Sequence, residues 1–353
     1  AILHNLNYFK QKLRPETKIL AVVKAFGYGS DGVKVASLLQ DKVDYFAVAY
    51  AHEGIALRKA NIKTPILVLH PQIQNFDQIV RYKLEPSIYN FKTLTAFLKY
   101  ADDQLLLNYP IHLKFNTGLN RLGLCLSDIS LILNNIVASK HVRIESILSH
   151  LAASEDESER DFTIGQLNNF AAIVKKIYLH LDYEPMIHTL NTSGVINYPE
   201  AQFDMVRIGI GLYGFGNDEK ETSHLKNSHI LKSIISQIHT IEPGETVGYN
   251  RAFIAKTLTK TATIPIGHAD GISRKLGNGN GYVTINNQKA PIVGNVCMDM
   301  IMVDISTIGC KEGDAVYIFK TQEDILHMAL KSETISYEIL TAISQRVKKM
   351  LKC

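Results

Sequence analysis

About the first 215 residues of this chain alternate short apolar runs with amphipathic segments, and this alternation limits the fold more than any other feature. Eight runs have the length and composition of strands: Ile19–Val23, Tyr45–Tyr50, Pro65–His70, Glu85–Tyr89, Ile111–Phe115, Arg143–Leu148, Met186–Leu190 and Asp204–Ile208. Most of them are continuously apolar, which is typical of parallel strands buried on both faces. Eight strand-then-helix units in succession predict a (β/α)₈ barrel, with an open doubly wound sheet as the alternative.

The pattern changes near Asn217. Residues 218–227 are polar and charged and are predicted to be a linker. Short strands separated by Gly, Pro and Asn turns follow, with no long helix between them: Ile230–Ile241, Lys256–Ile266, Gly281–Ile285, Ala290–Val293, Ile301–Ile305 and Ala315–Phe319. A basic amphipathic helix over Tyr337–Leu351 is expected to close the chain. We therefore predict an α/β barrel domain at 1–227 and a mostly β domain at 228–353.

Composition excludes several classes of protein. A net charge of +4, with the basic residues scattered, does not favour a nucleic-acid partner. Cys125, Cys297, Cys310 and Cys353 are far apart and show neither metal-ligand spacing nor a disulfide framework, which favours a reducing compartment. No apolar run approaches ~18 residues and no signal peptide is visible, so neither a membrane span nor secretion is predicted. We expect a cytoplasmic protein.

Lys24 is the first candidate for chemistry. It ends the first predicted strand, and Gly27 and Gly29 follow, so the chain must turn there. The carboxyl ends of parallel strands are where barrels place their active sites. An amine with apolar walls has a lowered pKa, and its free base attacks carbonyl groups. The alternative is a lysine that extends to solvent from a strand end, followed by an ordinary glycine turn.

Other polar side chains fall at or after the ends of the later strands. They are Tyr28, Lys114, Arg121, His150, His188, Asn191, Thr192 and Arg207, the last followed by Gly209. Such a set, with glycine amides, suits a phosphate-bearing aldehyde cofactor bound through a lysine. Simpler roles remain open, since Lys114 could pair with a carboxylate, the histidines could be core residues, and Arg121 could lie in a surface loop. No nucleotide-binding glycine motif and no metal-ligand spacing is present.

Seven sequence blocks resemble the alanine racemase family, the fold type III enzymes that depend on pyridoxal 5′-phosphate. They occur in the family's order across both predicted domains: Ala21-Val-Val-Lys-Ala-Phe-Gly-Tyr-Gly29, His112-Leu-Lys-Phe-Asn-Thr-Gly-Leu-Asn-Arg-Leu-Gly123, His188-Thr-Leu-Asn191, Val206-Arg-Ile-Gly-Ile-Gly-Leu-Tyr-Gly214, Pro265-Ile-Gly-His-Ala-Asp-Gly271, Val296-Cys-Met-Asp299 and Ile335-Ser-Tyr-Glu-Ile339. One block would be weak, but seven in order are specific.

The resemblance implies roles at single positions. Lys24 would form the Schiff base with the cofactor, Tyr28 would bind its phosphate, and Arg207 would face its pyridine nitrogen. His150 would flank the cofactor ring and contact Tyr249, which is otherwise simply a turn aromatic. Further cofactor-binding positions, mainly around the phosphate, would be Asn191, Thr192, Gly209, Ile210 and Tyr337.

The resemblance also implies how a substrate would be held and racemised. Arg121 would bind near the substrate carboxylate and the cofactor hydroxyl, and Met298 would contact the carboxylate. A carbamylated Lys114 would hold Arg121 in place. Lys24 and Tyr249 would act as two bases on opposite faces of the bound amino acid. In the family a partner subunit supplies the tyrosine, so a homodimer with shared sites is implied.

We therefore expect interconversion of L-alanine and D-alanine that supplies D-alanine for peptidoglycan. The sequence departs from the family pattern at His268, where a gate tyrosine is usual, and at Asn295, where arginine is common. The alternatives are a racemase of the same fold with broader specificity and a non-catalytic pyridoxal-phosphate-carrying protein. Such carriers lack the second domain, and this speaks against the latter.

Overall fold

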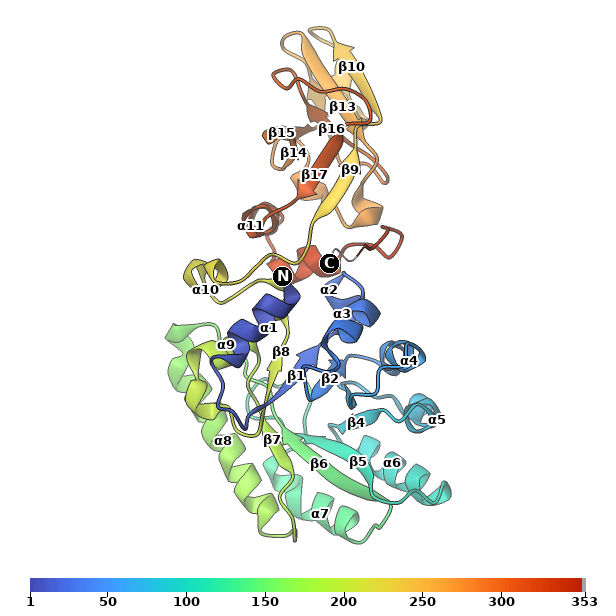
Figure 1. Ribbon diagram of the computed structural model, residues 1–353, viewed down its shortest axis with the longest axis vertical. Helices are drawn as coiled ribbons and strands as arrows, with labels where there is room; N and C mark the ends of the chain where they lie inside the picture. The colour runs from blue at the N-terminus through green and yellow to red at the C-terminus, as the bar shows by residue number, and fades with distance from the viewer. Residues whose placement is uncertain (351–353) are drawn as a thin grey trace. The chain divides into compact units, whose positions relative to one another are not determined.

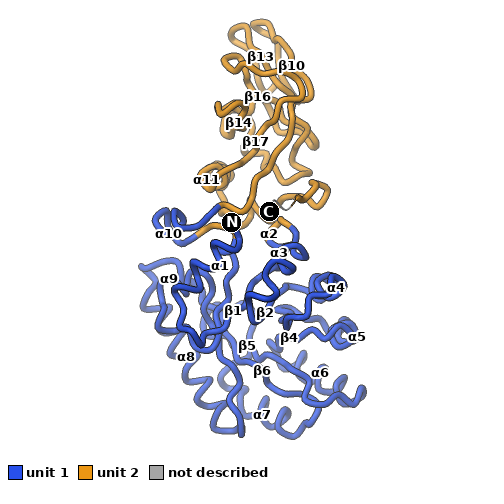
Figure 2. The backbone as a smooth tube through the Cα atoms, in the orientation of Figure 1, with its two compact units in different colours: residues 1–27, 31–212, 216–226 blue, residues 28–30, 213–215, 227–353 orange. Residues whose placement is uncertain are grey.

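The computed structural model describes residues 1–350 of the chain. They form two compact units (Figure 2). Unit 1 comprises residues 1–27, 31–212 and 216–226, and unit 2 comprises residues 28–30, 213–215 and the chain from 227 onward. We keep the division at residues 227 and 228 as a proposal for the domain boundary.

Unit 1 is built on eight parallel strands. They are β1 (Lys18–Val22), β2 (Tyr45–Val48), β3 (Ile66–Val68), β4 (Glu85–Ile88), β5 (Tyr109–Lys114), β6 (Val142–Leu148), β7 (Met186–His188) and β8 (Met205–Ile208). Their order, β7-β6-β5-β4-β3-β2-β1-β8, follows the sequence around a ring. Every residue of β2, β3 and β8 is buried, because parallel strands in a barrel are covered on both faces. The predicted barrel is confirmed.

The ring is completed between β7 and β8. These two strands share no ladder, but two backbone hydrogen bonds join the chain beside them. The Asp204 N–H donates to the Ile187 carbonyl at 3.2 Å, and the Arg207 N–H donates to the Leu190 carbonyl at 3.0 Å. The carboxyl ends of β7 and β8 are therefore held beside each other.

Most helices of unit 1 lie around the strands (Figure 1). They are α1 (Ile2–Lys10), α2 (Lys24–Tyr28, shared with unit 2), α3 (Gly32–Leu39), α4 (Ala51–Lys59), α5 (Phe76–Arg81), α6 (Phe91–Asp103), α7 (Ile129–Val137), α8 (Arg160–Tyr178), α9 (Thr192–Asn197) and α10 (Glu219–Ser223). The prediction of a plain linker over 218–227 was wrong. Asp218 caps α10, and Tyr8 donates a hydrogen bond to Glu221 at 2.6 Å, so this segment packs as part of unit 1.

Unit 2 holds a seven-stranded antiparallel sheet and a two-stranded hairpin. The strands are β9 (Leu231–Ile234), β10 (Gln237–Ile241), β11 (Thr246–Val247), β12 (Phe253–Ile254), β13 (Thr259–Ile264), β14 (Tyr282–Ile285), β15 (Gln288–Val293), β16 (Ile301–Asp304) and β17 (Ala315–Phe319). The sheet order is β10-β13-β16-β15-β14-β17-β9, and the hairpin is β11-β12. The single predicted strand Ile230–Ile241 is thus two strands at opposite edges of the sheet. The prediction of a mostly β second part is confirmed.

As predicted, only short 3₁₀ turns separate the described strands of unit 2, but helix α11 (Gln322–Lys331), which follows the last strand, was missed. Its signals are local. The Thr321 side chain accepts a hydrogen bond from the Asp324 N–H, and the Asp324 carboxylate accepts one from the Thr321 N–H. Ile325 and Met328 are buried at helical spacing.

The predicted closing helix over Tyr337–Leu351 is also wrong, because α12 (Ser336–Thr341) ends early. The Ser344 N–H donates to the Asp270 carbonyl at 3.2 Å. The Arg346 guanidinium binds the Asp270 and Asp299 carboxylates, each at 2.6 Å. These contacts draw the chain away from the helical path. Leu351 lies outside the described residues.

Candidate active site

Lys24 follows β1, in a turn with unusual backbone geometry. Ala25, Phe26 and Gly27 have φ of 53°, 55° and 65°, in the left-handed region that side chains disfavour. Glu53, in the first turn of α4, holds this turn. One of its carboxylate oxygens accepts the Ala25 N–H at 2.7 Å, and the other accepts the Ala49 N–H at 2.7 Å. Glu53 thus connects the carboxyl ends of β1 and β2.

The amine of Lys24 lies in a cationic, largely buried environment. Burial lowers its pKa below that of an ordinary lysine, and the charges of Arg121 and Arg207 lower it further. Glu53 opposes this shift. A lowered pKa increases the fraction of free amine, which is the nucleophilic form.

Arg207, on β8, is buried and makes five hydrogen bonds. Nη1 donates to His188 Nδ1 at 2.8 Å and to the His188 carbonyl at 3.1 Å. Nη2 donates to the carbonyls of Ser149 and Thr189, and to His150 Nδ1 at 3.0 Å. Burial lowers the pKa of Arg207 to about 10. No described residue accepts a hydrogen bond from its Nε, which leaves that donor for a ligand.

Both histidines beside Arg207 act as acceptors. Burial and the Arg207 charge hold the pKa values of His150 and His188 well below the usual range, so each ring is neutral. Since a guanidinium only donates, each Nδ1 must be unprotonated and each Nε2 must carry the hydrogen. The core-histidine alternative requires donation to backbone carbonyls, which neither ring makes among the described residues; His188 Nε2 instead meets Ser146 Oγ at 2.9 Å.

Lys114 ends β5 and is 7% exposed. Burial and the charges of Arg121, Arg207 and Lys24 lower its pKa to about 8. Within residues 1–350 it pairs with no carboxylate, so that alternative is wrong. Arg121 itself is exposed, and its charge acts on Lys24 and Lys114. Cations at the ends of β1, β5 and β8 make this end of the barrel attractive to an anion.

The loops after β7 and β8 meet at Thr192. Its Oγ1 accepts hydrogen bonds from the Gly209 N–H at 3.1 Å and the Gly211 N–H at 3.3 Å. Asn191 caps α9 by accepting the Gly194 N–H at 2.8 Å. A Cβ on Gly211 would lie 2.4 Å from the ring of Phe9, so only glycine fits there. Ile210, buried, begins the 3₁₀ turn η5 (Ile210–Tyr213).

The remaining predicted site residues lie in unit 2. Tyr28 is buried and stacks on Tyr213 with ring centroids 4.5 Å apart, and Tyr337 lies 6.1 Å from Tyr28. Burial raises the pKa of Tyr28 well above its ordinary value, so its hydroxyl stays protonated and can donate. These three tyrosines form one cluster.

Tyr249 follows β11 and is 73% exposed, while Met298 is 59% exposed. The Asn295 side chain donates to the Tyr249 carbonyl at 3.1 Å, and the Ala269 N–H donates to the Met298 carbonyl at 3.0 Å. Asn295 and His268 are the residues at which the sequence departs from the family pattern. Asn295 thus borders Tyr249, and His268, which immediately precedes Ala269, borders Met298.

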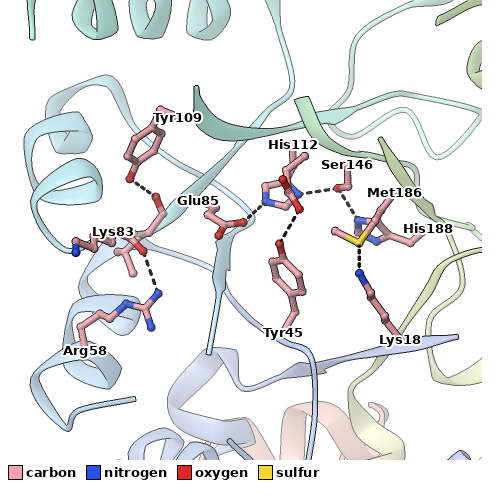
Figure 3. Close-up of polar contacts among 12 residues, drawn as sticks. Lys18, Tyr45, Arg58, Lys83, Glu85, Tyr109, His112, Ser146, Met186 and His188 are labelled. Atoms are coloured by element: carbon pink, nitrogen blue, oxygen red, sulfur yellow. Dashed lines mark hydrogen bonds and ion pairs between the residues drawn. The ribbon is translucent and has the colours of Figure 1, made fainter. Parts of the chain in front are cut away.

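Sequence reasoning missed Glu53 and a polar chain inside the barrel. That chain joins Glu85, His112 and Ser146 to His188 (Figure 3). The available signal was a polar residue inside an otherwise apolar strand, at His112 and Ser146. Nothing in the sequence paired them.

No helix in residues 1–350 has the length and apolar character that crossing a bilayer requires. Nor does that part of the chain gather three or more His, Cys, Asp or Glu side chains in a metal-binding cluster.

A barrel with a lysine of lowered pKa after β1, cations nearby and glycine amides after β8 is typical of enzymes that bind an anionic carbonyl compound through a lysine. Comparison with known proteins identifies the family. Residues 1–216 match the profile described as alanine racemase, N-terminal domain, and residues 229–351 match that of the C-terminal domain. The chain belongs to the alanine racemase family of enzymes.

Individual relatives agree over nearly the whole length. Alanine racemase 2 of Oceanobacillus iheyensis is 35% identical, over 99% of this chain and 91% of its own. The alanine racemase structure from Clostridium difficile 630 has a TM-score of 0.92 at 32% identity, covering 99% of this chain and 92% of its own. The alanine racemase of Bartonella henselae, solved with covalently bound pyridoxal phosphate, has a TM-score of 0.86 at 29% identity, over 99% and 96% of the two chains.

Proposed function

We propose that this enzyme interconverts L-alanine and D-alanine with pyridoxal 5′-phosphate, in the cytoplasm, and so supplies D-alanine for peptidoglycan. The observation that carries this proposal is the half-buried Lys24 side chain at the end of β1, whose pKa is lowered by burial and by the charges of Arg121 and Arg207 against the opposing charge of Glu53. Membership of the family and the relative with covalently bound cofactor support it.

The residues present fit pyridoxal phosphate. When bound, the cofactor supplies an aldehyde that captures an amine and a ring that delocalises the charge left by a departing proton. Lys24 would hold the aldehyde carbon. The amides of Gly209 and Gly211, which now converge on Thr192 Oγ1, would hold the phosphate together with Asn191 and Ile210. Tyr28 and Tyr337 are proposed to complete that phosphate site.

Arg207 is proposed to face the pyridine nitrogen through its free Nε–H. A guanidinium only donates and keeps its charge, so it binds this nitrogen without transferring a proton to it. A ring left unprotonated withdraws less charge, which limits side reactions at the substrate carbon. His150, held by Arg207 at 3.0 Å, is proposed to flank the ring and contact Tyr249.

Racemisation requires a proton to leave one face of the amino acid and another to arrive on the opposite face. Lys24 is proposed as the base on one face and Tyr249 as the base on the other. Tyr249 is 73% exposed in unit 2, which suits a residue offered to a second copy of the chain. We therefore propose a homodimer with shared sites.

Arg121 and Met298 are proposed to bind the substrate carboxylate. Lys114 is proposed to hold Arg121 as a carbamate, formed when the free amine takes up CO₂ and releases a proton. A pKa of about 8 leaves enough free amine near neutral pH for this reaction, and the new negative charge would pair with Arg121.

The test is circular dichroism of L-alanine incubated with the purified enzyme and pyridoxal phosphate. The optical activity is expected to decay to zero, and a Lys24→Ala sample serves as the control. L-serine measured in parallel distinguishes a racemase of broader specificity. No decay with cofactor bound would refute the proposal and leave a carrier role.

A further inference from the structure

Five polar side chains form a continuous hydrogen-bonded chain across the barrel interior. It starts at Glu85 on β4 and passes through His112 on β5, Ser146 on β6 and His188 on β7 to Arg207 on β8, so five consecutive strands each contribute one residue. Figure 3 shows its first four members. We refer to Glu85, His112, Ser146 and His188 as the interior relay.

The distances are those of good hydrogen bonds. His112 Nε2 lies 2.8 Å from Glu85 Oε2, and His112 Nδ1 lies 2.6 Å from Ser146 Oγ. Ser146 Oγ lies 2.9 Å from His188 Nε2, and His188 Nδ1 lies 2.8 Å from Arg207 Nη1. His112, Ser146 and His188 have no exposed surface. Buried polar groups in such an environment must satisfy one another.

The chain has a defined donor direction. Arg207 can only donate, so His188 Nδ1 accepts and His188 Nε2–H donates to Ser146. At the other end the Glu85 carboxylate accepts from His112 Nε2–H. The Ser146 hydroxyl accepts from His188 Nε2–H, and its own hydrogen goes to its other partner, His112 Nδ1, at 2.6 Å. Every donor then points from Arg207 toward Glu85, so a guanidinium that only donates begins the chain and a carboxylate that accepts ends it.

A uniform donor direction strengthens each acceptor in the chain, because successive hydrogen bonds polarise one another. His188 Nδ1 therefore becomes a better acceptor for Arg207 Nη1. That bond and the Arg207 bond to the His188 carbonyl fix the plane of the guanidinium. The plane of the guanidinium also determines the direction of the Arg207 Nε–H, which donates to no described residue.

We propose that Glu85, His112 and Ser146 are positioning residues that act through His188 to hold the Arg207 guanidinium in the orientation its ligand requires. The inference rests on the proposed function, in which that ligand is the pyridine nitrogen of the cofactor. None of the three residues needs to touch cofactor or substrate.

The first experiment is independent of activity. Two-dimensional NMR of the full-length protein labelled with ¹⁵N-histidine reports the tautomer of each ring, with peaks assigned from His112→Gln and His188→Gln variants. Each ring is expected to carry a hydrogen on Nε2 and none on Nδ1. A hydrogen on Nδ1 of either ring would overturn the donor direction, whether or not the protein racemises alanine.

The second experiment tests the coupling to the site. Glu85→Gln and Ser146→Ala are each expected to lower kcat for alanine about tenfold. At metal sites, removing a residue that hydrogen-bonds to a ligand typically lowers affinity or activity by about 10–100-fold, and we expect the lower end of that range here. KM is expected to stay within about twofold, because uniform substrate binding is retained. The absorbance maximum of the bound cofactor is expected to move, because Arg207 shifts against the ring.

Glu145→Gln is the matched control. This carboxylate lies beside the relay, 3.4 Å from the Tyr45 hydroxyl, but bonds to no relay residue. The Glu145→Gln variant should keep the wild-type kcat and the wild-type absorbance maximum of the cofactor. Glu85→Asp, which keeps a carboxylate, should have a kcat much closer to wild type than Glu85→Gln has. Wild-type kcat and absorbance in both Glu85→Gln and Ser146→Ala would refute a positioning role. A wild-type protein that fails to racemise alanine would instead refute the proposed function.

Discussion

The turn after Lys24 offers a quantitative test of how the site is held. Three residues with side chains, Ala25, Phe26 and Tyr28, have left-handed φ of 53°, 55° and 52°. Each such residue costs about 1–2 kcal/mol, so the turn stores about 3–6 kcal/mol of strain. The Glu53 carboxylate offsets this cost by accepting the Ala25 N–H and, with its other oxygen, the Ala49 N–H, both at 2.7 Å.

Glu53→Gln keeps the shape of the side chain but replaces one acceptor oxygen with an amide that donates. One of the two N–H groups then faces another donor, which costs about 2 kcal/mol. For a unit of this size the thermal midpoint is expected to fall by about 4–8 °C. Because the strained turn follows Lys24, the affinity for pyridoxal phosphate should fall as well.

The assay is thermal unfolding followed by far-ultraviolet circular dichroism, with a cofactor titration followed by visible absorbance. Asp77→Asn is the control, since Asp77 also lies in the first turn of a helix, α5, and its side chain accepts no hydrogen bond from the described residues. Its midpoint should remain at the wild-type value. A decrease of less than about 2 °C for Glu53→Gln would refute the reasoning.

Three further predictions concern the proposed chemistry. Lys24→Ala should lose the visible absorbance of covalently held pyridoxal phosphate, and retention of that absorbance would exclude Lys24 as the attachment point. Tyr249→Phe should keep the absorbance but lose most activity, with the two directions of racemisation affected differently; unchanged rates both ways would remove the two-base proposal. The pKa of Lys114 is about 8 in the folded protein and 10.5 in the unfolded chain. Between these pH values the unfolded chain binds more protons at Lys114 than the folded protein does. The contribution of Lys114 to the free energy of unfolding should therefore rise across that range. Lys114→Met should flatten this rise in the unfolding free energy of the cofactor-free protein, and an unchanged pH dependence would contradict the lowered pKa.

The local alternation of apolar runs and amphipathic segments was sufficient to predict the barrel. The strands of unit 1 are buried on both faces and therefore read as apolar runs, and each is followed by an amphipathic segment. Lys24, Lys114 and Arg207 were found because a charged residue inside or at the end of such a run is conspicuous. In unit 2 the strands of the seven-stranded sheet were found, but the hairpin strands β11 and β12 were missed. The pairing was not predicted either, as β9 and β10 show, since sheet order depends on partners distant in sequence.

The errors at the end of the chain have two causes. Helix α11 carries a local capping box that was overlooked. The expected helix from Tyr337 onward fails for a tertiary reason, since Arg346 is drawn to the carboxylates of Asp270 and Asp299. Helical propensity is too weak to outweigh such contacts.

By itself the sequence determined the strand-then-helix repeat, the change to a β-rich second part, and the residue types able to hold an aldehyde and a phosphate. Only the tertiary structure decided which buried polar groups meet: Glu53 with the turn after Lys24, and Glu85 with Arg207 through three intervening side chains. The physical reason is that periodicity encodes which face of an element is buried, whereas a hydrogen bond depends on two atoms brought within about 3 Å by packing of the whole barrel.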